Sequence, residues 1–238
     1  MALRLLAVET STEACSVALW VDGQVMERFE IAPRRHTELV LPWAGELLAE
    51  AGIAKSGLDA IAVGRGPGAF TGVRLAVALV QGMALALDKP VLPVSTLAAL
   101  ALQALPRANG RSILAAIDAR MGELYLGLFR ADASTGLVAQ GEEWMDSPAT
   151  VATSADRIIG IGSGFAAADG ALIAALGARL EASDADGLPH AADVVRLAAA
   201  AFLRDDAIPA DRLEPAYLRN KVALTLVEQS AARAASKQ

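Results

Sequence analysis

Four glycines and a proline fall within the nine residues Gly64–Gly72. The apolar run Leu58–Val63 precedes them and a second apolar run follows, so a buried strand is expected to end in a tight turn that opens a helix. Free N–H groups at a helix N-terminus attract anions, which makes this turn a candidate phosphate loop. No Gly-Lys-Ser/Thr follows, as a Walker A loop requires, and the dinucleotide fingerprint is matched only as Gly64-x-Gly66-x-x-Ala69. A structural turn and a ligand loop both stay open.

Two acids, Glu9 and Asp118, occupy equivalent points of an internal repeat. Residues 5–20 align without a gap on residues 114–129, and each copy reads as a strand, an acid, a turn and a second strand. The repeat predicts two halves of like topology. Carboxylates that converge on a phosphate site can support metal or acid–base chemistry, so an ATP-dependent transferase is one hypothesis. The alternative for Glu9 is a solvated turn acid.

The stretch Leu75–Leu87 carries no charge, and Gln81 is its only polar side chain. A surface helix normally shows a single apolar stripe, whereas a helix that is apolar all round must be covered on both sides. The cover is either the rest of the same chain or a second protein that approaches closely over small residues. This helix alone does not separate the two.

Composition excludes several classes of protein. Hydrophobic residues make up 54% of the 238 residues and charged residues 20%, which argues against disorder. No charge-free run reaches the ~20 uninterrupted residues of a spanning helix, and the N-terminus reaches an acid too soon for a signal peptide, so a soluble cytoplasmic protein is expected. Cys15 has no disulfide partner, and His36 and His190 form no metal motif. A net charge of −6 argues against a nucleic-acid binder acting alone.

The remaining elements follow from periodicity and turn signals. Asp22-Gly23 predicts a hairpin, Thr37 is the expected cap of the first helix, and Ser95-Thr96 caps a later one. The predicted strands are 3–8, 14–21, 24–31, 58–63, 90–94, the two strands of the repeat at 114–129, 138–142 and 157–162. The predicted helices are 37–51, 72–87, 97–105, 148–155, 166–176 and 191–204.

Together these landmarks resemble the TsaB family, also called YeaZ, a bacterial subunit of the machinery that makes threonylcarbamoyladenosine on tRNA. The matching pieces are Glu9–Thr12, Arg35–Glu38, Gly66–Arg74, Val94–Leu97, Asp118–Glu123 with Tyr125, and Pro215–Arg219. The resemblance implies the actin-like, Hsp70-like, sugar-kinase-like (ASKHA) α/β fold, with two related lobes that each have a mixed sheet and flanking helices. The implied division is an N-terminal lobe of residues 1–108 and a C-terminal lobe of residues 109–238, whose last helix, at about 210–228, packs back on the first lobe.

The resemblance also implies a role. TsaB-like proteins pair with the homologous transferase TsaD, joined by the ATPase TsaE, and TsaD modifies adenosine 37 of tRNAs that read ANN codons. TsaB-like proteins are the non-catalytic platform, with no cofactor or metal and only indirect or weak contact with tRNA. Glu9 stands where proteins of this fold that use ATP have aspartate, which weakens a metal–phosphate site. The implied remnants of a nucleotide site are Glu9, Thr10, Ser11, Gly66, Gly68 and Asp118.

In the family pattern two helices, here residues 37–51 and 72–87, form a four-helix contact with the same pair of the partner. The expected interface residues are His36, Leu39, Val40, Trp43, Leu47, Phe70, Val73, Arg74, Val77 and Val80. The same surface could pair with itself, so a homodimer is a second arrangement. The competing hypothesis is a stand-alone ATP-dependent transferase of the same fold.

Overall fold

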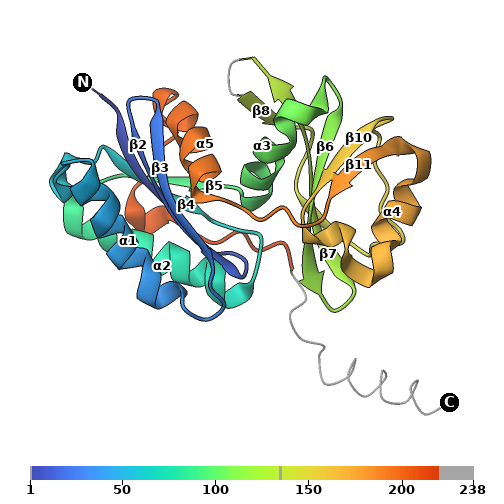
Figure 1. Cartoon of the computed structure of the whole chain (residues 1–238), viewed down its shortest axis with the longest axis horizontal. Coiled ribbons are helices and arrows are strands. Elements are labelled where there is room, and N and C mark those ends of the chain that lie inside the picture. The colour runs from blue at the N-terminus through green and yellow to red at the C-terminus, as the bar shows by residue number, and fades with distance from the viewer. Residues whose placement is uncertain (1, 134–135, 220–238) are drawn as a thin grey trace, which may run out of the picture.

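Two β-sheets with the same strand arrangement form the frame of the molecule, and helices cover their faces (Figure 1). The computed structural model describes residues 2–133 and 136–219. In the first sheet, of order β3-β2-β1-β4-β5, the first three strands are antiparallel and β1, β4 and β5 are parallel. Its strands are β1 (Arg4–Glu9), β2 (Ala14–Val21), β3 (Gln24–Ile31), β4 (Ala60–Gly64) and β5 (Val91–Val94).

The second sheet repeats this plan in the order β8-β7-β6-β10-β11, with β8, β7 and β6 antiparallel and β6, β10 and β11 parallel. The additional strand β9 pairs with β7. The strands are β6 (Ser112–Arg120), β7 (Glu123–Asp132), β8 (Gly136–Ala139), β9 (Trp144–Asp146), β10 (Ile158–Ile161) and β11 (Leu180–Asp184). The predicted fold class, two related α/β lobes with mixed sheets, is confirmed.

The helices differ in which sheet they cover. They are α1 (His36–Glu50), α2 (Phe70–Leu87), α3 (Thr96–Ala108), α4 (Ala171–Leu176) and α5 (Ala191–Leu203). Helices α1 and α2 pack on one face of the first sheet and α5 packs on the other, while α3 and α4 pack on the second sheet. In Figure 1, α3 and α5 lie between the sheets. The division at residue 108 stays a prediction, and the packing adds that α3 and α5 are exchanged between the lobes.

The internal repeat is real in topology but shifted in register. Glu9 pairs with Ser16 in the first hairpin, whereas its aligned residue Asp118 pairs with Leu124 in the second. The gapless alignment would have placed Tyr125 opposite Asp118. A one-residue shift turns a strand's side chains to the other face, so aligned residues of β2 and β7 lie on opposite faces of their hairpins: Val17 packs in one core with Leu6 and Val8, whereas Leu126 packs away from Ala115 and Ile117.

Several predicted boundaries were wrong for local reasons. Helix α1 starts at His36 without a side-chain cap, so Thr37 is not its cap. Helix α2 was predicted to start at residue 72 but starts at Phe70, also without a side-chain cap. Ser95 does cap α3, because its hydroxyl accepts the Ala98 N–H at 3.1 Å.

The second half departs further from the predicted elements. Residues 148–155 form no helix, because the Thr150 hydroxyl bonds the Asp146 carboxylate and the Ser147 carbonyl in a local turn instead. The helix predicted at 166–176 is broken, since Ala168 and Asp169 have positive φ, and only Ala171–Leu176 is α-helical. Strands β9 and β11 were not predicted. In the predicted last helix, Ala210–Arg212 is one 3₁₀ turn, and residues 220–228 lie outside the described part.

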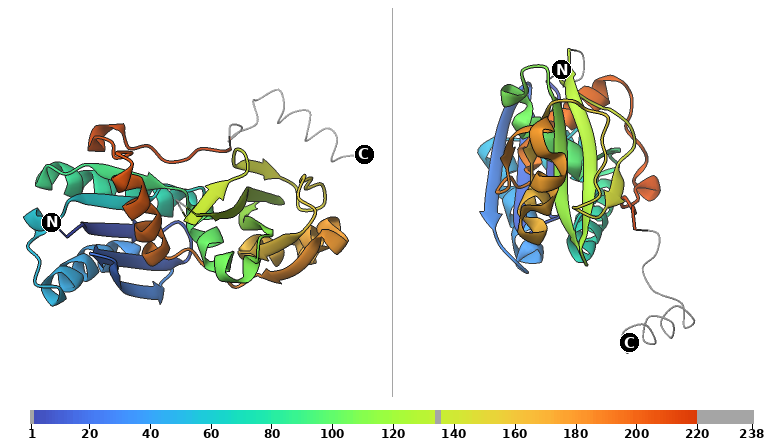
Figure 2. Two further views of the ribbon diagram at one scale, coloured as in Figure 1. Left: turned by 90° about the horizontal axis from the view of Figure 1, so that it is seen from above. Right: turned by 90° about the vertical axis from the view of Figure 1, so that its right-hand side faces the viewer.

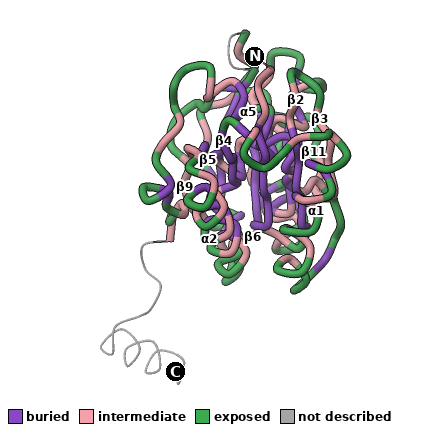
Figure 3. Tube along the Cα trace, turned by 90° about the vertical axis from the view of Figure 1, so that its left-hand side faces the viewer, coloured by how far each residue is buried: buried purple, intermediate pink, exposed green. Residues whose placement is uncertain are grey.

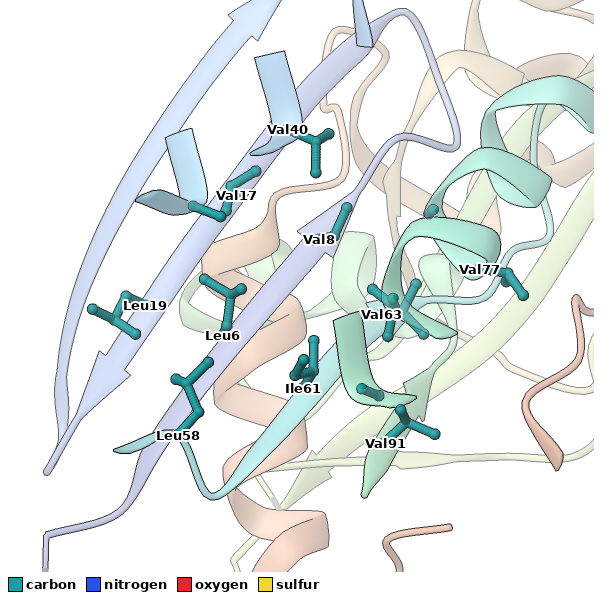
Figure 4. Close-up of a cluster of buried hydrophobic side chains, with 14 of the residues drawn as sticks. Leu6, Val8, Val17, Leu19, Val40, Leu58, Ile61, Val63, Val77 and Val91 are labelled. Atoms are coloured by element: carbon teal, nitrogen blue, oxygen red, sulfur yellow. The ribbon is translucent and has the colours of Figure 1, made fainter. Parts of the chain in front are cut away.

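The first lobe's larger core lies between its sheet and helices α1 and α2. Figure 4 shows Val40 of α1 and Val77 of α2 in the same cluster as the β-strand side chains Leu6, Val17 and Val63. Val40 is fully buried and Val77 is 5% exposed. The inner faces of both helices are therefore used by the chain itself.

A half-buried carboxylate attaches α5 to the first sheet. Glu27 of β3 accepts hydrogen bonds from the Ser16 hydroxyl at 2.7 Å and the Ala192 N–H at 3.0 Å, and it pairs with His190 Nδ1 at 3.1 Å. Burial alone would raise the pKa of Glu27, but the bonds from His190 and Ser16 outweigh it and lower that pKa. The bond to Glu27 raises the pKa of His190 against the opposite effect of burial.

This pair predicts a pH-dependent stability. The raised pKa of His190 gives stabilisation that is complete below its ordinary value of 6.5 and is lost as pH rises through the folded value. The lowered pKa of Glu27 gives stabilisation that is present above 4.5 and is lost as pH falls through its folded value. In urea denaturation, His190→Gln should cost about 1 kcal/mol near pH 5.5 and less near pH 8.5. A cost that does not change with pH would contradict this account.

Candidate functional site

The glycine-rich turn between β4 and α2 is packed against the turn between β1 and β2. The Thr10 hydroxyl donates to the Gly72 carbonyl at 2.8 Å, and the Ala69 N–H donates to the Ser11 carbonyl at 2.7 Å. A Cβ on Gly72 would overlap the Thr10 carbonyl oxygen, and one on Gly68 would lie 2.6 Å from that of Ser11. The glycines therefore allow two backbone segments to touch. The space that a phosphate loop would leave for its anion is filled here by the chain's own backbone.

Glu9 lies at the centre of this closed arrangement. Its side chain is 1% exposed, and it accepts hydrogen bonds from the Ser11 N–H at 2.6 Å and the Thr96 hydroxyl at 3.1 Å. A Cβ on Gly64 would overlap its carboxylate. Burial raises the pKa of Glu9, with the bonds from Ser11 and Thr96 opposing it. Glu9 is thus a buried structural acid rather than a solvated one.

Asp118 does not join Glu9. Its carboxylate accepts the backbone N–H of Arg120 at 2.8 Å and pairs with the Arg120 guanidinium at 3.1 Å within its own turn. Its backbone N–H donates to the Ser163 hydroxyl at 3.1 Å. The two carboxylates are bound separately, so the structure does not form the convergent acid pair that the transferase hypothesis needs.

The two histidines also have structural partners. His36 Nε2 lies 3.1 Å from the Thr12 carbonyl and 3.2 Å from the Ala14 carbonyl, and His190 pairs with Glu27. Within residues 2–133 and 136–219, no group of three or more His, Cys, Asp or Glu side chains could hold a metal ion.

The outer face of the α1–α2 pair is open to solvent (Figure 3). Of the expected interface residues, Phe70 is 62% exposed, Arg74 is exposed, and His36, Leu39 and Trp43 are half-buried. The expected contacts Val40, Leu47, Val73, Val77 and Val80 are between 0% and 5% exposed and pack in the core. These five were wrongly expected on the outer face, because the inner sides of both helices pack on the sheet.

Sequence reasoning missed the residues that do form the outer face. On α1 the exposed positions include Leu41 and Ala49, and on α2 they include Ala78, Gly82 and Leu85. Leu41 is 50% exposed and Leu85 is 67% exposed. The α2 positions recur at intervals of three or four residues, so helical spacing could have identified them. Small residues in such a row let a second helix approach closely.

Helix α2 also passes a test of length and composition for a membrane span, and 28% of its residues are buried. A helix that packs on the core of a soluble domain passes the same test. The inner residues of α2 belong to the core between the first sheet and helices α1 and α2, where the helix packs on β4.

The chain is similar in sequence and in fold to known proteins. The family model for TsaD, tRNA N6-adenosine threonylcarbamoyltransferase, matches residues 29–224. The TsaB protein of Escherichia coli, named for tRNA threonylcarbamoyladenosine biosynthesis, is 38% identical over 228 residues, covering 93% of this chain and 96% of that protein. The solved YeaZ of Pseudomonas aeruginosa is 44% identical with a TM-score of 0.83, covering 91% of this chain and all of that one.

Similarity to the transferase itself is partial. The tRNA N6-adenosine threonylcarbamoyltransferase of Chlorobaculum tepidum is 32% identical over 108 residues, which cover 39% of this chain and 31% of that protein. The TsaB-named relative from Haemophilus influenzae is instead matched over 95% of its length, at 37% identity. The near-complete matches and the shared two-lobed fold show that the chain belongs to the TsaB (YeaZ) family of tRNA threonylcarbamoyladenosine biosynthesis proteins.

Proposed function

We propose that the chain is a non-catalytic cytoplasmic subunit that binds a TsaD-like threonylcarbamoyltransferase. In this proposal the partner forms N6-threonylcarbamoyladenosine at position 37 of tRNAs that read ANN codons. A TsaE-like ATPase joins the pair, and tRNA contacts this subunit only indirectly or weakly. The chain itself holds no metal or cofactor.

The observation that carries the proposal is the exposed apolar face of α1 and α2. We call this the outer face and define it as the exposed Leu41 and Ala49 and the half-buried Gly45 of α1, with the exposed Phe70, Ala78, Gly82 and Leu85 of α2 and the one charged residue among them, Arg74. A row of apolar and small side chains exposed on two adjacent helices is typical of a helix–helix interface. Because the transferase of C. tepidum shares sequence with part of this chain, a partner with a matching helix pair would give a four-helix contact.

The closed glycine turn supports placing the chemistry in the partner. The turn's backbone is bonded to Ser11 and Thr10, and Glu9 occupies the space beside Gly64. A nucleotide phosphate would have to displace these contacts. The stand-alone ATP-dependent transferase is therefore the less favoured function.

The outer face could also pair with a second copy of this chain. Two copies would bring the same helices together about a twofold axis, as an isologous interface requires. In this proposal the homodimer and the complex with the transferase compete for one surface.

Calorimetry with the TsaD-like protein of the same organism tests the proposal. We expect binding between the two proteins, and no binding of ATP with Mg²⁺ at micromolar concentration by this chain alone. Micromolar nucleotide binding by the isolated chain would favour the transferase alternative. Absence of any complex at high micromolar concentration would reject the platform role.

A further inference from the structure

The last described residues form a strap across the two lobes. We call residues 208–219 the C-terminal strap; Figure 2 shows it as the orange-red segment that leaves the first lobe and runs to the second. It starts beside β5, where Ile208 bridges to Val91, and the Gln81 amide donates to the Ala210 and Leu213 carbonyls at 3.2 and 3.0 Å. The strap is therefore bound to α2.

The strap reaches the second lobe at the turn between β6 and β7. The Arg219 guanidinium donates to the Ala119 carbonyl at 3.0 Å and pairs with Glu123 at 2.9 Å. The Ala216 N–H donates to the Arg65 carbonyl at 2.8 Å on the first lobe. The residues between these attachments are thus held at both ends.

Tyr217 lies between these two attachments and contacts Arg74 of α2. Its hydroxyl accepts the Arg74 Nε–H at 3.1 Å, and the Arg74 guanidinium carbon is 5.4 Å from the centre of its ring. The same carbon lies 3.3 Å from the centre of the Phe70 ring. The guanidinium is therefore held by two aromatic side chains, which are 62% (Phe70) and 56% (Tyr217) exposed.

Arg74 is the single charged residue of α2. Within the described residues, its guanidinium forms no ion pair with a carboxylate, although nine other arginines do. Its Nε–H is used by Tyr217, and its terminal N–H groups have no partner in that part of the chain. It is a positioned cation at one end of an uncharged, apolar helix face.

Covering this face removes water from Arg74. A charge taken out of water without a partner is costly, whereas a guanidinium that meets a carboxylate forms two parallel hydrogen bonds. Because Phe70 and Tyr217 already restrict its side chain, Arg74 loses less conformational freedom when that partner binds. The complementary group is a carboxylate next to an apolar helix face.

We propose that Arg74 is the charged anchor of the outer face, that it takes an aspartate or glutamate side chain of the protein partner, and that Tyr217 of the C-terminal strap is the residue that positions it. This inference rests on the proposed function. It extends the binding surface from the helices of the first lobe to the strap that joins both lobes.

Binding of the full chain to the TsaD-like protein, measured by calorimetry, tests the inference with four variants. We expect Arg74→Glu to weaken binding about 100-fold or more, and Arg74→Lys about tenfold, because lysine cannot form the paired bonds. Tyr217→Phe keeps the ring but loses the bond to Nε, and should weaken binding several-fold. The matched control is Arg130→Glu, an exposed charge reversal on β7, which should bind like the wild type.

The outcomes separate the inference from the function beneath it. A wild type that does not bind rejects both. If the wild type binds and both Arg74→Lys and Arg74→Glu bind as tightly as the wild type, the inference is overturned and the proposed function stands. The inference is also overturned if Arg74→Glu lowers the affinity for tRNA while its affinity for the TsaD-like protein is unchanged, because Arg74 would then bind a tRNA phosphate rather than a carboxylate of the protein partner. Circular dichroism of each variant verifies that these exposed substitutions leave the fold intact.

Discussion

The Ala78→Glu variant is expected to lose binding to the TsaD-like protein by at least 100-fold while the isolated chain stays folded. Ala78 is exposed on the outer face of α2, so glutamate there is solvated in the free chain, and its helix propensity is close to that of alanine. In the complex the same carboxylate would lie in a close helix contact, where an unpaired charge is costly. Calorimetry measures the affinity for the TsaD-like protein, and thermal unfolding verifies that the free variant is folded.

The control for this prediction is Ala174→Glu, on α4 of the second lobe, which is exposed and should bind like the wild type. Val77 is not a useful site for the same charge, because it is 5% exposed and glutamate there would disrupt the core. Wild-type affinity in Ala78→Glu would show that the outer face is not the interface.

The Gly72→Ala variant is expected to lose about 3 kcal/mol or more of unfolding free energy. The new Cβ would overlap the carbonyl oxygen of Thr10, a backbone atom in a turn that is bonded to the same segment. The turn between β1 and β2 and the glycine-rich turn are joined by the Thr10–Gly72 and Ala69–Ser11 hydrogen bonds, so moving the two turns apart would break these bonds. Urea denaturation at equilibrium measures the change.

Gly82→Ala in the same helix is the matched comparison. No atom lies within 4 Å of its added Cβ, so this variant should gain up to about 1 kcal/mol from helix propensity. If both variants changed stability alike, the glycine turn would be free to open, and a ligand loop would again be a valid interpretation of Gly64–Gly72.

The strand-rich plan of the chain was predictable because its signals are local. The apolar stretches at residues 3–8 and 14–21 predicted β1 and β2, the Asp22-Gly23 turn signal predicted β3, and the repeat at residues 114–129 predicted the second hairpin. The short strands β9 and β11 carry weak patterns and were missed. The helix predicted at 148–155 does not form, because side-chain bonds of Thr150 decide the local structure there.

The outer face was predicted less well. Helix α2 is apolar on all sides, so its sequence holds little contrast between a core face and a partner face. Val77 and Val80 were expected as partner contacts, yet both pack on the sheet, while Ala78 and Gly82 of the same helix are exposed. The contact of Arg74 with Tyr217 joins positions 143 residues apart, a separation that periodicity does not address.

By itself the sequence determined the family, the two-lobed α/β fold and the position of the glycine turn, because these depend on motifs and on periodicities of a few residues. Only the tertiary structure decided that the turn is filled by Thr10 and Ser11, that Glu9 is buried, and which side of α2 is free. These properties depend on which distant segments meet at a surface, and a helix that is apolar all round can be buried on either side at similar cost.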